Sequence, residues 1–123
     1  MSRVPLVVVF VTAGSRREAD RIAAALVEER LAACVNLVAP VVSIYQWEGK
    51  IERGREVLLI AKTRRALVPR LTARVQALHS YDVPEIIALP IEAGSTPYLE
   101  WLTAETRPSK TRKRTRRNTA ATR

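Results

Sequence analysis

Residues 35–62 read VNLVAPVVSIYQWEGKIERGREVLLIAK, in which two stretches of strand-forming residues flank Glu48-Gly49. β-Branched and aromatic residues on both sides of a short glycine turn predict a long hairpin. We expect its second arm to be loosened around residues 53–55, where a glycine lies between two arginines. Pro40 interrupts the first arm, and because proline cannot donate to a strand ladder, this arm should lie at a sheet edge or bulge there.

The chain before the hairpin predicts a strand and a helix. Residues 4–11 form an unbroken apolar run rich in valine, which is typical of a central strand covered on at least one face. Ser15 and Glu18 have the spacing of a capping box, and apolar residues follow at helical intervals as far as Leu31. We therefore expect an amphipathic helix from Ser15 to about Leu31.

The chain after the hairpin predicts a helix, a strand and a second helix. Leucines and valines from Leu67 to Leu78 fall at helical spacing, with Pro69 tolerated in the first turn. Two prolines frame a short strand at residues 85–89, and Thr96 followed by proline marks the start of a C-terminal helix. The order β-α-β-β-α-β plus a helix predicts an α+β, ferredoxin-like split βαβ sandwich, with two helices on one face of an antiparallel sheet.

The hairpin should be longer than the helices that cover the sheet. The thirteen residues from Val35 to Trp47 would extend about 40 Å, against about 25 Å for the seventeen residues of the first predicted helix. The part of the hairpin beyond the helices carries Ile44, Tyr45 and Ile51 besides Trp47. Apolar side chains on an open ribbon invite a partner, and self-association is the simplest one.

Composition divides the chain into one folded domain, residues 1–106, and a basic tail, residues 107–123. The net charge is +9, and the tail alone carries eight lysines and arginines and no acidic residue. The rest has thirteen basic and twelve acidic residues and is nearly neutral. No apolar run approaches the roughly 20 residues that span a bilayer, so no membrane partner is expected. Cys34 is the only cysteine, which excludes an intramolecular disulfide and agrees with a reducing compartment.

The tail from Arg107 to Arg123 has two interpretations. Its lysines and arginines would hold nucleic acid or another acidic surface by releasing counterions. Because no aromatic residue lies among them, such binding should be independent of base sequence. Alternatively, the tail is a disordered extension that keeps the protein in solution, since it lacks the apolar periodicity from which a core could form.

Five blocks of the chain carry more specific patterns: LVEERLAACVN at 26–36, SIYQWEGK at 43–50, KT at 62–63, LHSYDVPEI at 78–86 and YLEW at 98–101. In this order they resemble the signatures of the CutA family of divalent-cation tolerance proteins. The resemblance runs from about Val4 to Thr106 and leaves the basic tail outside it.

The resemblance implies a ferredoxin-like fold, a homotrimer, a cytoplasmic location and a link to divalent metal ions, copper above all. It implies no settled catalytic activity, and no cofactor is required beyond Cu or another divalent metal ion. We therefore expect a trimeric metal-binding or metal-response protein that is not an enzyme. The residues agree, because no Ser-His-Asp, Cys-His or paired-carboxylate arrangement can be assembled from the one histidine and the spacings in this sequence.

The same resemblance implies a metal site. Glu85 and His79 are the expected ligands. Some members of the family carry a cysteine and a second histidine implicated in copper binding, and this chain has Val11 and Leu78 at those positions. His79 has an alternative role as a helix C-terminal residue that caps the last carbonyls.

A cleft between subunits is also implied, with Lys62, Tyr81 and Trp47 near the metal ligands. The aromatic and apolar residues expected at the trimer interface are Ile44, Tyr45, Trp47 and Trp101.

Two other functions remain open from the sequence. A small-molecule sensor like the PII signalling trimers would use the same fold and intersubunit clefts, which is an argument from fold alone. A nucleic-acid accessory protein would act through the basic tail.

Overall fold

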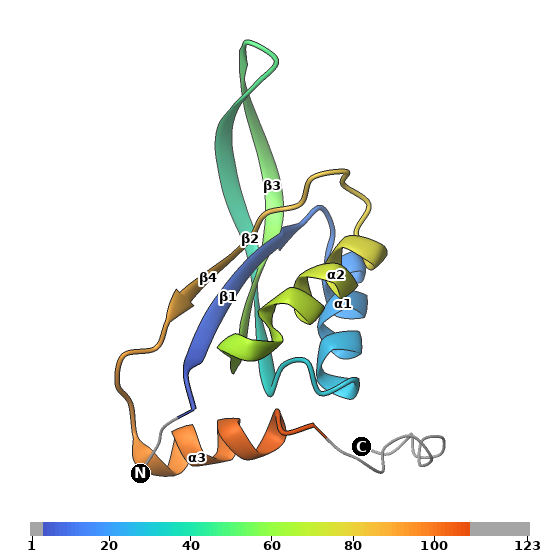
Figure 1. The fold of residues 1–123 in the computed structure, drawn as a ribbon. Helices are drawn as coiled ribbons and strands as arrows, with labels where there is room; N and C mark the ends of the chain where they lie inside the picture. The colour runs from blue at the N-terminus through green and yellow to red at the C-terminus, as the bar shows by residue number, and fades with distance from the viewer. Residues whose placement is uncertain (1–3, 109–123) are drawn as a thin grey trace.

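The computed structural model describes residues 4–108 and has an α+β architecture (Figure 1). Its four strands are β1 (Leu6–Ala13), β2 (Cys34–Trp47), β3 (Lys50–Arg64) and β4 (Ile86–Pro90). Its helices are α1 (Arg16–Glu28), α2 (Val68–Leu78) and α3 (Thr96–Glu105), with a 3-10 turn, η1 (Arg65–Leu67), before α2. The strands pair antiparallel in the order β2-β3-β1-β4, so the predicted ferredoxin-like sandwich is confirmed.

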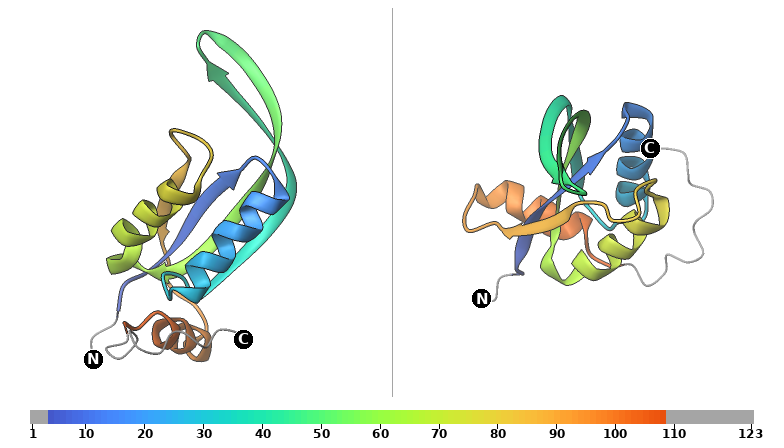
Figure 2. Two further views of the ribbon diagram at one scale, coloured as in Figure 1. Left: turned by 90° about the vertical axis from the view of Figure 1, so that its right-hand side faces the viewer. Right: turned by 90° about the horizontal axis from the view of Figure 1, so that it is seen from above.

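Helices α1 and α2 cover one face of the sheet, and the core lies between the two layers (Figure 2). Alternate residues of β1 belong to this core, because successive side chains of a strand point to opposite faces. Val9 and Val11 are fully buried together with Leu26 of α1 and Leu71 of α2. Each such side chain stabilises the fold by roughly 1.5–3 kcal/mol. The predicted central position of β1, between β3 and β4, is confirmed.

Strand β2 lies at a sheet edge and is irregular at Pro40. It pairs only with β3, and the register shifts between Val38 and Val41, where the Ala39-Pro40 peptide is cis. The predicted edge position and bulge are therefore confirmed. The predicted loosening around residues 53–55 is wrong, because the ladder continues there through pairs such as Ser43 with Gly54.

The hairpin closes in a two-residue turn and projects beyond the helices (Figure 1). Glu48 and Gly49 both have positive φ angles, 51° and 81°, which the tight hairpin turn requires. Most of the apolar surface near the tip is exposed: 56% of Ile44, 58% of Trp47 and 67% of Ile51. The predicted uncovered ribbon is thus present.

The predicted capping box of α1 is only half formed. Oγ of Ser15 accepts a 3.1 Å hydrogen bond from the backbone N–H of Glu18, as predicted. The carboxylate of Glu18 does not return to Ser15 but binds Ser80 in the loop after α2. The helix ends at Glu28, earlier than predicted, since Arg30 adopts a φ of 59° that no α-helix continues.

Helix α3 packs across the end of the sheet that lies opposite the hairpin tip (Figure 1). Thr96 was predicted as the N-cap with Pro97 as the first helical residue, but Ser95 is the N-cap, so the helix begins at Thr96. Leu102 of this helix is fully buried. Arg64 at the end of β3 donates to the carbonyl of Thr103, at 2.7 Å, and so holds the C-terminal turn of α3.

The described residues contain no helix that is long and apolar enough to cross a bilayer. The basic tail predicted at residues 107–123 lies almost entirely outside the described residues, so its two interpretations stay open.

Candidate functional site

Tyr81 ties the loop between α2 and β4 to the base of the hairpin. Its hydroxyl donates a 2.8 Å hydrogen bond to Oε2 of Glu56 on β3, while Ser43 on β2 donates a 2.6 Å bond to Oε1 of the same carboxylate. Burial, together with the hydrogen bond and the charge of Glu56, raises the pKa of Tyr81 to about 12. A Cβ on Gly14 would lie only 3.1 Å from this hydroxyl, so the glycine makes room for the phenol.

The side chain of His79 is fully buried, and both of its ring nitrogens have partners in the same chain. Nδ1 lies 3.1 Å from the backbone N–H of Tyr81, which must donate, so Nδ1 accepts. Nε2 then carries the proton and donates to the carbonyl of Thr12 at 2.7 Å. A metal ligand needs a free imidazole nitrogen, and in this conformation His79 offers none.

The alternative role of His79 as a helix cap is only partly observed. Its backbone N–H donates to the carbonyl of Val75 and closes the last turn of α2. Its ring points elsewhere and fastens the loop to the end of β1 through Thr12. His79 thus connects the loop after α2 to the end of β1.

Glu18 braces the same loop from the start of α1. Oε2 accepts a 2.6 Å hydrogen bond from the backbone N–H of Ser80, and Oε1 accepts one of 3.1 Å from its hydroxyl. Burial alone would raise the pKa of Glu18, but the hydrogen bonds from Ser80 outweigh it and hold the pKa below the ordinary value. The ionised carboxylate of Glu18 therefore binds the loop after α2, and the second hydrogen bond of the capping box, from the backbone N–H of Ser15, is not made.

Glu85 is the predicted metal ligand that the structure leaves accessible. It is exposed and directly precedes β4, whose first residue, Ile86, pairs with Val11 of β1. Within residues 4–108, no three histidine, cysteine or acidic side chains are grouped so that they could hold a metal ion. Val11 is fully buried and Leu78 packs against the core, so both departures from the family pattern are apolar positions of the fold.

The predicted cleft residues do not meet within one chain. Lys62 pairs across the sheet with Val8 and donates to the side-chain oxygen of Asn36. Trp47 lies beside Lys50 at the hairpin tip, six residues along β3 from the Glu56 that Tyr81 contacts, which is about 20 Å of strand. The structure therefore gathers His79 and Tyr81 and separates Lys62 and Trp47 from them.

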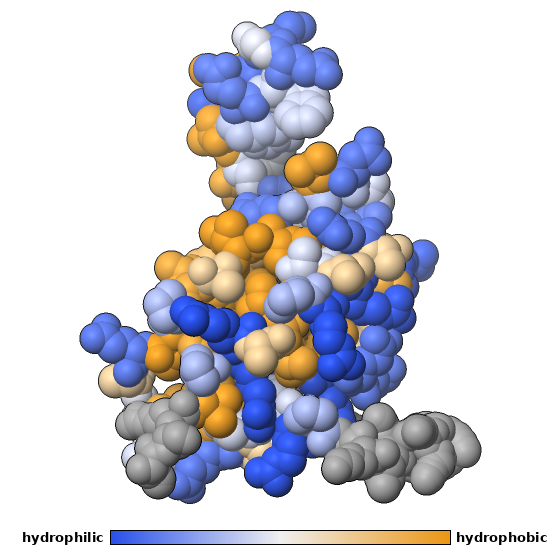
Figure 3. All heavy atoms as spheres, viewed as in Figure 1, coloured by the Kyte–Doolittle hydropathy of each residue, from blue (hydrophilic) through white to orange (hydrophobic). Residues whose placement is uncertain are grey.

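The sheet face away from α1 and α2, which we call the open face, is apolar. The registers place six side chains on it in adjacent strands: Val8, Phe10, Leu58, Ile60, Ile87 and Leu89. Figure 3 shows apolar side chains over this part of the molecule and along one side of the hairpin above it. Ile87 and Leu89 are 51% and 45% exposed.

The aromatic residues expected at an interface are also accessible. Tyr45 on β2 is 47% exposed and Trp101 on α3 is 43% exposed. Trp101 stacks obliquely against Tyr98 of the same helix, with ring centroids 5.5 Å apart. The open face, the hairpin and this aromatic pair together leave a large apolar surface without cover in one chain.

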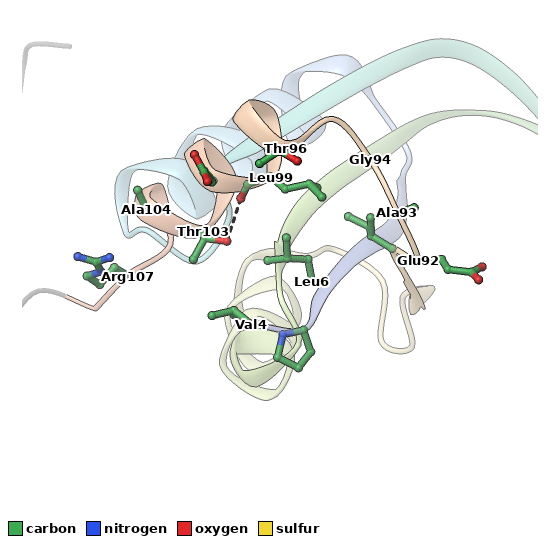
Figure 4. Close-up of a pocket in the computed structure, with 13 residues that line it drawn as sticks. Val4, Leu6, Glu92, Ala93, Gly94, Thr96, Leu99, Thr103, Ala104 and Arg107 are labelled. Atoms are coloured by element: carbon green, nitrogen blue, oxygen red, sulfur yellow. Dashed lines mark hydrogen bonds between the residues drawn. The ribbon is translucent and has the colours of Figure 1, made fainter. Parts of the chain in front are cut away.

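A groove of about 860 Å³ lies apart from these residues, between the start of β1, the β4–α3 loop and α3 (Figure 4). Leu6 and Leu99 line its apolar side, and Arg107 lies at the end where α3 finishes. None of the predicted site residues lines it.

Sequence reasoning missed Glu56 and the second role of Glu18. Nothing in the hairpin sequence marked Glu56, because its importance comes from Tyr81, 25 residues further on. Glu18 does carry a sequence signal, but the spacing of the capping box accounts for it without any contact to the loop after α2.

Comparison with known proteins identifies relatives of this chain by sequence and by fold. The sequence model of the family described as CutA1 divalent ion tolerance protein matches residues 7–105. The chain belongs to the CutA1 divalent ion tolerance family. The match begins at the second residue of β1 and includes every other strand and helix through the end of α3.

Relatives of the CutA1 family are similar over most of the described chain. Protein CutA, chloroplastic, of Arabidopsis thaliana is 53% identical over 104 residues, which are 85% of this chain and 57% of the relative. The divalent-cation tolerance protein CutA of Thermus thermophilus is 52% identical over 99 residues, 80% of this chain and 96% of the relative. The chain spans between 52% and 60% of the length of the plant and mouse relatives it matches.

Solved structures of the CutA1 family have the same fold. The crystal structure of CutA1 from Oryza sativa superimposes with a TM-score of 0.84 at 51% identity, covering 86% of this chain and 97% of that one. The periplasmic divalent cation tolerance protein CutA from Archaeoglobus fulgidus superimposes with a TM-score of 0.81 at 42% identity, covering 83% and 99%.

Proposed function

We propose that this chain is a divalent-cation tolerance protein that acts as a homotrimer and not as an enzyme. The family match over residues 7–105 supports the role in cation tolerance. The structural observation that supports the proposed trimer is the uncovered apolar surface of the hairpin and the open face. Exposed apolar surface of this extent lowers the solubility of a monomer. Burying it against a partner stabilises the assembly by about 25 cal/mol per Å² of apolar area.

The geometry favours contacts between unlike surfaces of neighbouring copies. The hairpin projects beyond its own helices, so its Ile44 and Trp47 are out of reach of their own core. The hairpin of one copy laid against the open face of the next would cover both surfaces. Such a head-to-tail contact closes into a ring when the rotation between copies is one third of a turn.

We further propose that Cu or another divalent cation binds between copies, with Glu85 as a carboxylate ligand. Divalent ions of this kind take four or more ligands, so Glu85 alone cannot hold one tightly. A neighbouring copy would bring Lys62 and Trp47 to the Tyr81 side of the cleft, where they would line the site. Because neither an ammonium group nor an indole N–H can coordinate a cation, the remaining ligands would be water or carboxylates of that copy. His79 would take part only if its bond to Thr12 or to Tyr81 opened.

Titration calorimetry of the full chain with Cu(II) and Zn(II) tests the metal site. Glu85→Gln should weaken binding by at least about tenfold, since it removes a charged ligand. Glu92→Gln removes an exposed charge just beyond β4 and should leave the affinity unchanged. Failure of the wild-type chain to bind either ion, or equal losses in both variants, would contradict direct metal binding at Glu85.

A cytoplasmic location belongs to the same proposal. The single, partly exposed Cys34 supports a reducing compartment, because an exposed thiol is stable there. Relatives of the family are named chloroplastic in Arabidopsis thaliana and periplasmic in Archaeoglobus fulgidus. Fractionation of the native host cells, with detection of the untagged chain, tests this part.

A further inference from the structure

The groove between the start of β1, the β4–α3 loop and α3 contains none of the residues proposed to bind a metal ion. Its volume of about 860 Å³ is within the range of roughly 300–1,000 Å³ that is usual for small-molecule sites. Leu6 is buried and Leu99 is half-buried, and both lie between the two ends of the groove (Figure 4). The groove is therefore large enough, and apolar enough in its middle, to hold a small ligand.

The two ends of the groove carry opposite charges. Arg107 lies where α3 finishes, and Glu92 lies at the opposite end, on the β4–α3 loop (Figure 4). Glu100 on α3 adds a second carboxylate to the lining. Among residues 4–108, none of these three side chains takes part in an ion pair. A ligand with a positive group at one end and a negative group at the other therefore matches the groove in charge.

Cations rather than carbonyl groups determine the charge at the Arg107 end. The last turn of a helix leaves carbonyl oxygens unpaired, and these would repel an anion. Here Arg64 donates to the carbonyl of Thr103 at 2.7 Å, and Arg30 donates to the carbonyl of Ala104 at 3.2 Å. Burial and then the nearby charge of Arg107 lower the pKa of Arg64, which agrees with two cations close to each other. An anion beside Arg107 thus meets guanidinium groups.

The spacing of the charged side chains along α3 limits the length of the ligand. Glu100 and Arg107 are seven residues apart, and the backbone N–H of Arg107 still donates to the carbonyl of Ala104, as in a final helical turn. At 1.5 Å per residue, the two positions are about 10 Å apart along the helix axis. An extended chain of three amino acids has the same length, about 10 Å.

The β4–α3 loop offers main-chain groups to such a ligand. Glu92, Ala93 and Gly94 line the groove and are exposed. Within the part of the chain that the structure describes, their backbone N–H groups donate to no other group. An extended peptide can form hydrogen bonds with main-chain groups of this kind, as an added strand does. The loop therefore favours a peptide over a zwitterion that has no amide groups.

We propose that the groove binds a short extended peptide with free ends and an apolar central side chain. The amine of the peptide lies at Glu100, its central side chain lies against Leu6 and Leu99, and its carboxylate lies at Arg107. Trp101 does not line the groove and remains available for self-association. Peptide binding needs no metal ion and no second copy, so it is independent of the role in cation tolerance.

Titration calorimetry of the full chain with the tripeptide Ala-Leu-Ala at pH 7 tests the proposal. The dissociation constant should lie below about 1 mM. Ala-Asn-Ala has a polar central side chain of similar size and should bind at least about tenfold more weakly, because it cannot replace the apolar contact. Failure of Ala-Leu-Ala to bind, or equal affinities for the two peptides, would overturn the proposal.

Peptides with blocked ends test the two charged contacts. Acetylating the amine or amidating the carboxylate should each weaken binding to the wild type by roughly three- to tenfold. In Arg107→Gln amidation should have no further effect, and in Glu100→Gln acetylation should have none, because each variant lacks the matching charge. Arg16→Gln and Glu28→Gln remove exposed charges of α1 and should respond to both blocked peptides as the wild type does. Amidation that still weakens binding to Arg107→Gln, or acetylation that still weakens binding to Glu100→Gln, would overturn the assigned contacts.

Discussion

The hydroxyl of Tyr81 lies 2.8 Å from Oε2 of Glu56 and joins the loop before β4 to the base of the projecting hairpin. The loop is held on its other side by Glu18 and His79, which reach it from α1 and from the end of α2. The segment that leads to Glu85 is thus braced against three elements, which keeps the start of β4 in a fixed place.

Replacement of Tyr81 by Phe removes this hydrogen bond and should lower the free energy of unfolding by about 1 kcal/mol at pH 8. The folded state raises the pKa of Tyr81 from 10.0 to about 12, so the folded protein holds this proton more tightly than the unfolded chain does. The resulting stabilisation is complete below pH 10 and is lost as the pH rises toward 12. Urea unfolding at pH 8 and pH 11 should show that the free energy of unfolding falls less between these pH values for Tyr81→Phe than for the wild type.

Tyr45→Phe is the control for this variant, because Tyr45 is exposed and, among the described residues, it is the hydroxyl of Tyr81 that donates to Glu56. It should reproduce the wild-type stability at pH 8 and most of the wild-type loss at pH 11, because the charge of Tyr45 is the smallest of the contributions that raise the pKa of Tyr81. Equal behaviour of the two variants at both pH values would show that the bond to Glu56 has no energetic role.

Glu18→Ala leaves the backbone N–H of Ser80 without its acceptor and should cost about 2 kcal/mol at pH 7. The pKa of Glu18 is lowered in the folded state, so its stabilisation is present above its ordinary value of 4.5 and disappears as the pH falls below it. Between pH 7 and pH 3.5 the variant should therefore lose less stability than the wild type. Chemical denaturation at both pH values measures this difference, and Asp20→Ala, an exposed acid on the same helix, should behave as the wild type.

Arg64→Met keeps the aliphatic stem but removes both hydrogen bonds to the last turn of α3. Amide hydrogens of residues 100–105 should then exchange at least about tenfold faster, which corresponds to a local loss of about 1.4 kcal/mol. Arg65→Met, next to it but exposed and without such bonds in the described residues, should leave exchange unchanged. Mass spectrometry of exchanged peptides distinguishes these results, and unaltered exchange in Arg64→Met would contradict the role of the arginine as a clamp.

A buried hydrogen bond explains why a threonine, Thr63, follows Lys62 at the end of β3. Its side chain is fully buried and donates a 2.7 Å hydrogen bond to the carbonyl of Leu31. Thr63→Val keeps the shape of the side chain but leaves the carbonyl of Leu31 without this donor, so the free energy of unfolding should fall by about 1–2 kcal/mol. Thr63→Ser keeps the hydroxyl and loses only a methyl group, and it should lose about 1 kcal/mol through packing. Melting temperatures that rank the serine variant below the valine variant would contradict this assignment.

The fold could be predicted from the sequence because its signals are local. The capping residue Ser15, the turn at Gly49 and the proline at position 40 each act on their own neighbourhood, and their order along the chain leaves few topologies. The boundaries were less accurate: α1 ends at Glu28 because the chain must turn at Arg30, which no periodicity shows.

The candidate site was predicted less completely, because it depends on contacts between distant residues. The ring of His79 has the right chemistry for a metal ligand, but it is hydrogen-bonded to Thr12. Thr12 lies 67 positions away in the sequence, so no local pattern predicts this bond. Glu56 went unnoticed for the same reason. The open face was visible only in part, since a continuous apolar run in residues 4–11 fits a strand covered on one face or on both.

The most direct test of the proposed assembly is the mass of the full chain in solution, measured by light scattering during size-exclusion chromatography. The wild type should elute with three times the mass of one 13.8 kDa chain. Replacing Val42 and Ile44 by Glu puts two charges on the exposed hairpin and should produce monomers, whereas Val83→Glu, at an exposed loop position, should remain trimeric. A wild-type chain that is monomeric at micromolar concentration would contradict the central claim that the hairpin and the open face bind another copy.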